Sequence, residues 1–194
     1  MKKSENGTIF QNDKYCVEIT IDETYTIDSA DNKRYDCVLN PSSKRRGDMY
    51  KVLHLSVKGV QSADIALIGD YYTYPEDCTI LEDNILTVLQ NDYITQIDLK
   101  TLQIISGYEL DLFGTTFSIY RMVDGYLIYG EIEIIKLDNE FNTVWKFSGR
   151  DIFVSISDKN AFELTERSIK LYDFEDNFYE LDFDGNVICE IPKG

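Results

Sequence analysis

Apolar and polar residues alternate along much of the chain. Tyr15, Val17 and Ile19 occupy every second position of one such stretch, and Tyr93 and Ile97 belong to another. A period of two places the apolar side chains on one face of a half-buried strand. We therefore predict an all-β fold with less than about 10% helix. The other predicted strands are 35–39, 50–57, 64–72, 85–90, 102–105, 117–122, 126–130, 131–137, 143–147, 152–157, 168–173, 178–183 and 187–191, with at most one helical turn, at 161–167.

An internal repeat appears when Asp98, Asp138 and Asp182 are aligned. Apolar residues precede each aspartate by one and four positions and follow it by six. The unit is thus an apolar strand, a turn led by aspartate and a second apolar strand, recurring at spacings of 40 and 44 residues. A period of this length, built from about four short strands, is typical of a β-propeller blade. Any antiparallel meander also gives hairpins of similar length, so a meander without a true repeat stays open as the alternative interpretation.

The segment from Tyr179 to Ile188 resembles the hairpin of quinoprotein-type propeller blades, and 97–102 is a looser copy. The likeness covers residues 78–194. It lacks the tryptophan docking motif and the Trp-Asp and Gly-Gly signatures of other propellers. The resemblance implies architecture only, without a quinone cofactor.

We therefore expect a single all-β domain spanning 1–194, with N-terminal strands in 1–77 and three blade-like repeats in 78–194. About four and a half blades would fit in a chain of this length. The antiparallel meander repeats would form a small or incomplete β-propeller-like arrangement. A β-sandwich is the alternative fold.

The charge is strongly asymmetric. The net charge is −16, but residues 1–60 carry +1, and residues 61–194 carry −17 from 9 Lys/Arg and 26 Asp/Glu. Such a field repels nucleic acid and anionic membranes and attracts basic proteins. A purely solubilising role is the alternative interpretation. No apolar run approaches the roughly 20 residues of a membrane helix, and polar residues follow Met1, so we expect a cytoplasmic protein.

Metal and cofactor chemistry find little support in the sequence. The four cysteines are widely spaced and His54 is the single histidine, so we predict no zinc site, no disulfide and no cofactor. His54 is expected to be a half-buried, hydrogen-bonded residue, with a general base as the alternative. Asp182, Asp184 and Asn186 fit the start of a calcium loop, but Val187 replaces the required glycine, which favours a hairpin turn.

Glu131 and Glu133 form a pair of carboxylates two residues apart. On a strand they would share one face at about 6.5–7 Å, near the separation that inverting glycosidases use. Their clean alternation with Ile132 and Ile134 favours a solvent-facing row instead.

Three tyrosines stand beside two acids in 71–77. Tyr71, Tyr72 and Tyr74 precede Glu76 and Asp77. Tyrosine gives rigid contact area with a polar end and is enriched at interfaces. The stretch is therefore a candidate patch for a basic partner, unless the tyrosines pack over the edge of the core.

These features favour a non-enzymatic, cytoplasmic protein-binding module with a basic protein partner. Its sharpest form is a bacterial immunity or inhibitor protein that neutralises a basic toxin or nuclease. The alternatives are a carboxylate-based glycan hydrolase and a structural repeat module of a larger assembly. The candidate partner-binding residues are Tyr71, Tyr72, Tyr74, Glu76, Asp77, Glu131 and Glu133.

Overall fold

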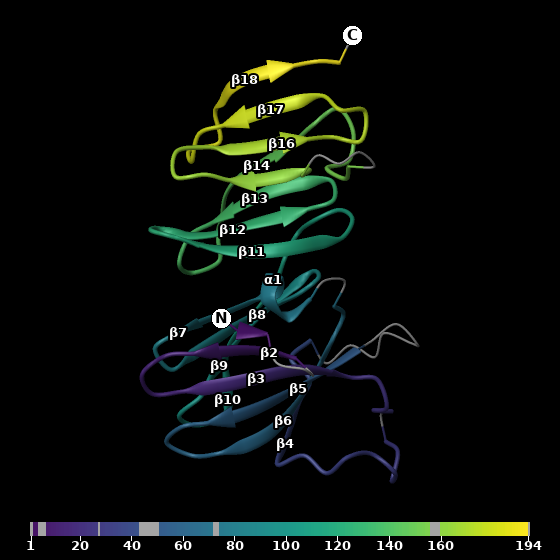
Figure 1. Ribbon diagram of the computed structural model, residues 1–194, viewed down its shortest axis with the longest axis vertical. Helices are drawn as coiled ribbons and strands as arrows, with labels where there is room; N and C mark the ends of the chain where they lie inside the picture. Colours follow the sequence, from purple (N-terminus) through teal and green to yellow (C-terminus); the bar gives the residue numbers. More distant parts are fainter. Residues whose placement is uncertain are drawn as a thin grey trace. The chain divides into compact units, whose positions relative to one another are not determined.

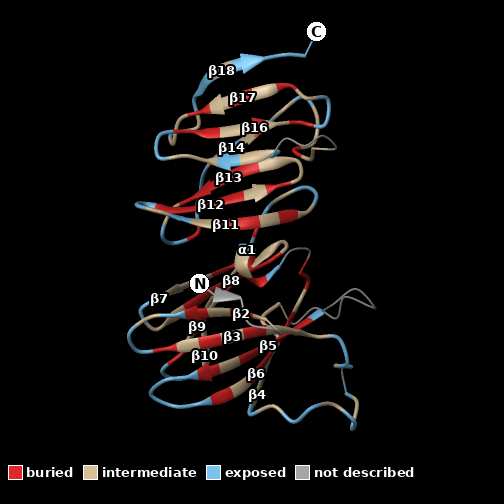
Figure 2. Ribbon diagram, viewed as in Figure 1, coloured by how far each residue is buried: buried red, intermediate tan, exposed pale blue. Residues whose placement is uncertain are grey.

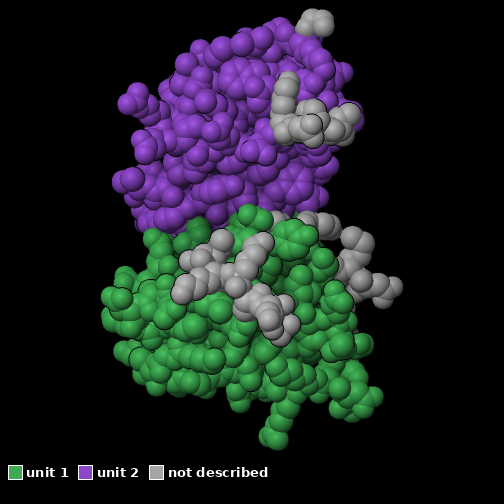
Figure 3. All heavy atoms as spheres, in the orientation of Figure 1, with its two compact units in different colours: residues 1–110 green, residues 111–194 purple. Residues whose placement is uncertain are grey.

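The computed structural model describes residues 2–3, 7–26, 28–42, 51–71, 74–155 and 160–193, with the backbone alone at 2–3. The chain divides into two compact units, residues 1–110 and 111–194 (Figures 1 and 3). The first of the three predicted repeats therefore groups with the N-terminal strands. Each unit is described by itself below.

The first unit begins with the six-stranded sheet A. Its strands are β1 (Lys2–Lys3), β2 (Thr8–Gln11), β3 (Cys16–Asp22), β4 (Cys37–Leu39), β5 (Lys51–Lys58) and β6 (Ala63–Gly69), in the order β1-β2-β3-β5-β6-β4. Among the strands described in this sheet, only β4 and β6 run parallel. Alternate residues of the strands, such as Ile19, Leu53 and Leu55, are fully buried. The predicted alternation thus places the apolar residues of each strand on one buried face of the sheet, as expected for half-buried strands.

A smaller cluster covers the opposite face of sheet A. Val52, Ala66 and Ile68 point to that face and are buried, and Tyr25 and Tyr35 pack against them. Both tyrosines come from the segment between β3 and β4. This segment therefore shields an apolar patch that the sheet would otherwise expose to water.

Sheet B completes the first unit. It contains β7 (Thr79–Glu82), β8 (Ile85–Gln90), β9 (Tyr93–Asp98) and β10 (Gln103–Glu109) in a simple antiparallel meander. The four-residue α1 (Pro75–Cys78) precedes it and is the only helix in the described ranges. Gln90 links the two sheets because its Nε2 donates to the Ile68 carbonyl at 2.7 Å.

The second unit consists of two further meanders. Sheet C contains β11 (Thr116–Met122), β12 (Gly125–Gly130), β13 (Glu133–Leu137) and β14 (Thr143–Ser148). Sheet D contains β15 (Phe162–Leu164), β16 (Ile169–Tyr172), β17 (Phe178–Leu181) and β18 (Val187–Ile191). Leu127 and Ile134 of sheet C share a buried cluster with Leu171, Tyr179 and others of sheet D. Trp145 Nε1 also donates to the Phe183 carbonyl at 3.1 Å.

The structure confirms an all-β fold of blade-like repeats. Sheets B, C and D are three successive four-stranded antiparallel meanders, and each aligned aspartate ends or directly follows the third strand of its meander. Asp138 Oδ1 accepts the backbone N–H groups of Glu140 and Asn142. Asp182 Oδ1 accepts those of Asp184 and Asn186. The aspartate recurs in each repeat because its carboxylate accepts hydrogen bonds from the backbone of the turn that follows it.

Some predicted boundaries are wrong. β13 begins at Glu133, so Glu131 lies in the bend before the strand. Residues 152–155 form no strand: Phe153 is fully buried, but its N–H donates to the Glu131 carbonyl, outside any ladder. Residues 162–164 form β15, where a helical turn was expected.

Candidate binding groove

An open groove of about 310 Å³ lies beside α1 in the first unit. One side is formed by the start of the helix, with Tyr74, Pro75 and Glu76. The other side comes from β2 and β3 and from the residue before β2. Those lining residues are Gly7, Thr8, Ile19, Thr20 and Ile21. One side of the groove thus comes from the segment 71–77, which the sequence analysis named as a candidate site. The other side comes from strands that held no candidate site residue.

One hydrogen bond fixes the carboxylate of the groove. The Thr8 hydroxyl donates to Glu76 Oε2 at 2.8 Å, across 68 residues of sequence. Thr8 is buried, so its hydroxyl needs such a partner. Glu76 is only half-buried, which leaves this acidic group at the groove surface.

Gly7 allows the strands to approach closely at the other side of the groove. A Cβ at this position would lie 2.5 Å from the Ile19 carbonyl oxygen and from Thr20 Cγ2. Backbone cannot yield in the way that a flexible side chain does. The groove therefore depends on glycine here for its shape.

Two further predicted residues lie at the surface beside the groove. Tyr74 is 70% exposed and lines it, and Asp77 is exposed on α1. Proline suits the first helical position because its ring presets the backbone and it lacks an N–H that would be unpaired there. Tyr74, Glu76 and Asp77 thus form an aromatic and acidic edge.

Tyr71 is not part of that edge. It is only 3% exposed, and its hydroxyl accepts from Gln90 Nε2 at 2.8 Å. Burial raises the pKa of Tyr71 well above its ordinary value. A partner could not contact this side chain in the observed conformation, so its prediction as a contact residue is corrected. Tyr72 lies outside the described residues.

The carboxylates of Glu131 and Glu133 do not share a strand face. Glu131 Oε2 accepts the Thr115 N–H at 3.3 Å. Glu133 is 14% exposed, and its Oε2 lies 3.4 Å from Lys146 Nζ without the alignment of a hydrogen bond. Glu131 therefore lies in a bend, and Glu133 on β13 forms an ion pair with Lys146. The two residues do not form the expected solvent-facing row.

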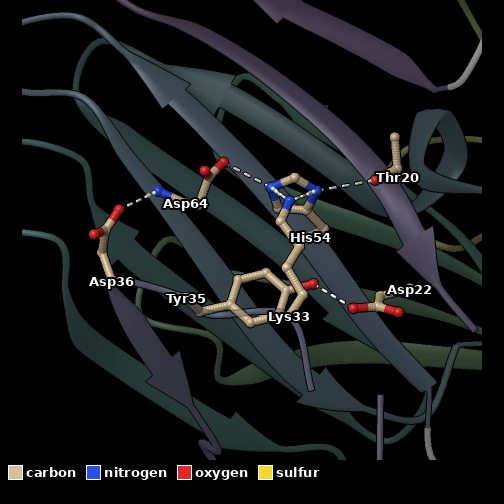
Figure 4. A network of polar contacts seen from close by, with 7 residues as sticks. All are labelled: Thr20, Asp22, Lys33, Tyr35, Asp36, His54 and Asp64. Atoms are coloured by element: carbon tan, nitrogen blue, oxygen red, sulfur yellow. Dashed lines mark hydrogen bonds and ion pairs between the residues drawn. The ribbon is translucent and has the colours of Figure 1, made fainter. Parts of the chain in front are cut away.

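A polar network around His54 lies next to the groove strand β3 (Figure 4). His54 Nε2 lies 2.7 Å from Asp64 Oδ1, and His54 Nδ1 lies 3.4 Å from Thr20 Oγ1. Lys33 Nζ lies 3.1 Å from Nε2 and 3.3 Å from Nδ1. The Tyr35 hydroxyl donates to Asp22 at 2.5 Å. Thr20 also lines the groove, so the network supports one of its walls.

Hydrogen bonding sets the electrostatics of this network. The hydrogen bond from His54 lowers the pKa of Asp64, and Lys33 adds to the effect. Burial would raise the pKa of Asp22, but hydrogen bonds from Tyr35 and Thr24 outweigh it and lower the pKa. Burial and the bond to Asp22 raise the pKa of Tyr35. As the sequence predicted, His54 is a half-buried, hydrogen-bonded residue.

Other candidate chemistry has an internal explanation. No three His, Cys, Asp or Glu side chains of the described residues gather closely enough to hold a metal ion. Asp182 accepts hydrogen bonds from its own turn, and all four cysteines are free thiols. Within the described ranges, no helix has the length and apolar composition needed to span a bilayer.

No protein-family model and no curated protein matches the chain. Among solved structures it is similar to the Pan2 WD40 domain of Neurospora crassa, with 14% identity and a TM-score of 0.46 over 60% of this chain and 38% of that one. It is also similar to BamB of Moraxella catarrhalis, with 11% identity and a TM-score of 0.42 over 77% and 49%. A third similar structure is the AfRom2 CNH domain, with 10% identity and a TM-score of 0.47 over 95% and 66%.

The chain spans less than half the length of the first structures it matches. The β-propeller-like architecture follows from the strand order of sheets B, C and D themselves.

Proposed function

We propose that the chain is a non-enzymatic, cytoplasmic protein-binding module that engages a basic protein through its acidic surface. Its sharpest form is a bacterial immunity or inhibitor protein that neutralises a basic toxin or nuclease. The net charge of −17 in residues 61–194 supports a basic partner, because it accelerates the encounter with one.

The observation that carries the proposal is the groove beside α1. It combines an exposed aromatic ring, from Tyr74, with the carboxylate of Glu76, and Asp77 lies next to them. An arginine or lysine side chain suits this combination, because its cation is attracted by both a ring face and a carboxylate. A groove can also exclude water around such an anchor, which strengthens the contact.

The alternative of a carboxylate-based glycan hydrolase gains no specific support. Its two candidate carboxylates contact Thr115 N–H and Lys146 and lie on different elements. The alternative of a structural repeat module draws only on the meanders, and a fold of this kind hosts many functions.

Capture of a partner tests the proposal. The purified chain is used as bait for a lysate of its source cells, and captured basic proteins are identified by mass spectrometry and then purified for direct binding measurements. Tyr74→Ala and Glu76→Gln should each weaken binding about tenfold or more, as expected for anchor residues. Phe113→Ala is the matched control, because Phe113 is an equally exposed aromatic, at 74%, in the other unit. Binding that both groove variants leave unchanged would refute the groove as the docking site.

A further inference from the structure

The two faces of the central strands of sheet D differ in burial, whereas those of the central strands of sheet C do not. On β12 and β13 nearly every residue is buried, whereas on β16 and β17 buried and half-buried residues alternate. The buried residues of sheet D are Ile169, Leu171, Tyr179 and Leu181, and they pack into the core shared with sheet C. The half-buried residues therefore point to the opposite face, here called the outer face of sheet D.

The strand register arranges the outer face in two rows across the sheet. The apolar row is Tyr172, Phe178 and Ile191, and the polar row is Glu163, Lys170, Glu180 and Cys189. In the apolar row the rings of Tyr172 and Phe178 lie 5.1 Å apart, and Ile191 is 57% exposed. Antiparallel sheets that face water on one side normally present polar residues there. The apolar row departs from that pattern, and β18, which carries Ile191, is mostly exposed (Figure 2).

Sheet A shows how this chain covers an apolar row of the same kind. There, Tyr25 and Tyr35 from the segment after β3 bury Val52, Ala66 and Ile68. On the outer face of sheet D, Ile191 stays exposed, and Tyr172 and Phe178 of the same row are only half-buried. Exposed apolar residues that cluster in this way mark an interaction surface.

We propose that the outer face of sheet D is the interface of a homodimer. A two-fold axis parallel to the strands and running between β16 and β17 brings the two rows of one copy onto the same rows of the other. Tyr172 of one copy then lies opposite Phe178 of the other, and Lys170 opposite Glu180. Such an isologous contact makes each pairing twice.

The signs of the polar row select a second copy as the occupant. Glu163, Lys170 and Glu180 alternate in charge across neighbouring strands. After the half-turn Lys170 faces Glu180 twice and Glu163 faces the uncharged Cys189, so no like charges meet, whereas a basic protein would meet Lys170 at the centre. The Ser168 hydroxyl donates to Glu180 Oε1 at 2.7 Å, which holds that carboxylate at its place in the row. The inference is independent of the proposed docking groove, which lies in the first unit.

Sedimentation velocity tests the dimer at concentrations from about 5 to about 200 μM, which extend high because a contact through one four-stranded sheet is small and small interfaces are weak. Each copy carries −16, so the two repel each other at long range. Raising the salt from about 0.05 to about 0.5 M screens this long-range repulsion more than it screens the Lys170–Glu180 pairs enclosed in the interface, so it should strengthen the dimer. Binding of a basic partner should weaken over the same range, so the two results are distinguishable. A chain that stays monomeric at about 200 μM and high salt would overturn the proposal.

Charge reversal tests the geometry of the interface. Lys170→Glu and Glu180→Lys should each weaken the dimer about tenfold or more, because like charges then face each other. The double variant restores both pairs and should recover most of the affinity. The controls are Lys100→Glu and Glu140→Lys, which make the same charge changes at exposed turn residues.

The outcomes of the charge reversal are distinct. Loss in both single variants, recovery in the double variant and little change in the controls support the proposed axis. A dimer that persists in both single variants contradicts it, and so does equal weakening by the controls. Circular dichroism identifies a single variant that fails to fold. In that case Ile191→Ser, at an exposed position, takes its place and should also weaken the dimer.

Discussion

At the scale of single residues, three aspartates in equivalent positions hold the turns of the repeats. Hydrogen bonds lower the pKa of Asp98, Asp138 and Asp182, led in each case by an asparagine side chain, from Asn84, Asn142 and Asn186 respectively. Two of these asparagines are four residues from their aspartate. Local bonds of this kind have a sequence signal, which is why alignment on the aspartates found the repeat.

Asp138→Ala should lower the melting temperature at neutral pH by removing the acceptor of three hydrogen bonds. Because the folded-state pKa is lowered, the stabilisation is present above the unfolded pKa of about 3.9 and is lost as the pH falls through the folded pKa. The difference from the wild type should therefore shrink between about pH 5 and pH 2. Thermal unfolding across this range measures it, with Glu140→Ala as the control. A difference independent of pH would contradict the prediction.

His54→Ala should raise the pKa of Asp64 toward its ordinary value. The hydrogen bond from His54 is the largest cause of its lowered pKa, and Lys33 supplies only part of the remainder. An NMR titration of the Asp64 carboxyl carbon measures the change. Thr20→Val is the control, because it removes the hydroxyl near Nδ1 and leaves the Asp64 contact. An unchanged Asp64 titration in His54→Ala would show that a group other than His54 lowers the pKa of Asp64.

The residues of the groove were only partly predictable. Tyr74, Glu76 and Asp77 stand together in the sequence, so their composition marked them. Thr8 carried no signal, because its partner Glu76 is 68 residues away. Burial of the tyrosines was one of the two alternatives, but the hydrogen bond from Gln90 of β8 that accompanies the burial of Tyr71 carries no local signal. Contacts between distant segments come from the fold and not from local pattern.

At the scale of elements, the alternation of apolar and polar residues predicted most strands. It was wrong where a residue is buried without pairing in a sheet, and where a short segment pairs without showing a period. Phe153 is buried like a strand residue, yet its neighbour Ile152 accepts the Phe174 N–H outside any sheet. Residues 162–164 are too few to show a period, and they become β15 because they pair with β16. Short edge strands of this kind depend on a neighbour that a local pattern does not contain.

Gly7→Ala should loosen the junction of β2 and β3 that shapes the groove. The new methyl group would meet the Ile19 backbone at 2.5 Å, so the strands must shift. Overpacking of this kind costs about 1–3 kcal/mol. Chemical denaturation measures the loss, and hydrogen exchange should show faster exchange in 8–11. Unchanged stability and exchange would show that the strands can separate here at no cost.

At the scale of the whole molecule, the sequence itself shows the charge asymmetry, and its pattern predicted the meanders. It did not predict the boundary between the two compact units at residue 110. The repeats begin at β7, yet the first unit extends to residue 110. Hydrogen bonds from Gln90 to Ile68 and Tyr71 join sheet B to sheet A, and no periodicity encodes them. Whether 1–194 behaves as a single domain in solution stays a prediction.

The most direct test of the account is the rate at which a captured basic partner associates with the chain at two salt concentrations. The acidic field should give a fast encounter with a basic partner, and the groove should give a slow release. Raising the salt from about 0.05 to about 0.5 M should therefore lower the association rate at least about tenfold. Tyr74→Ala should mainly raise the dissociation rate. An association rate equal at both salts, with dissociation unaffected by Tyr74→Ala, would contradict the central claim that this acidic surface binds a basic protein.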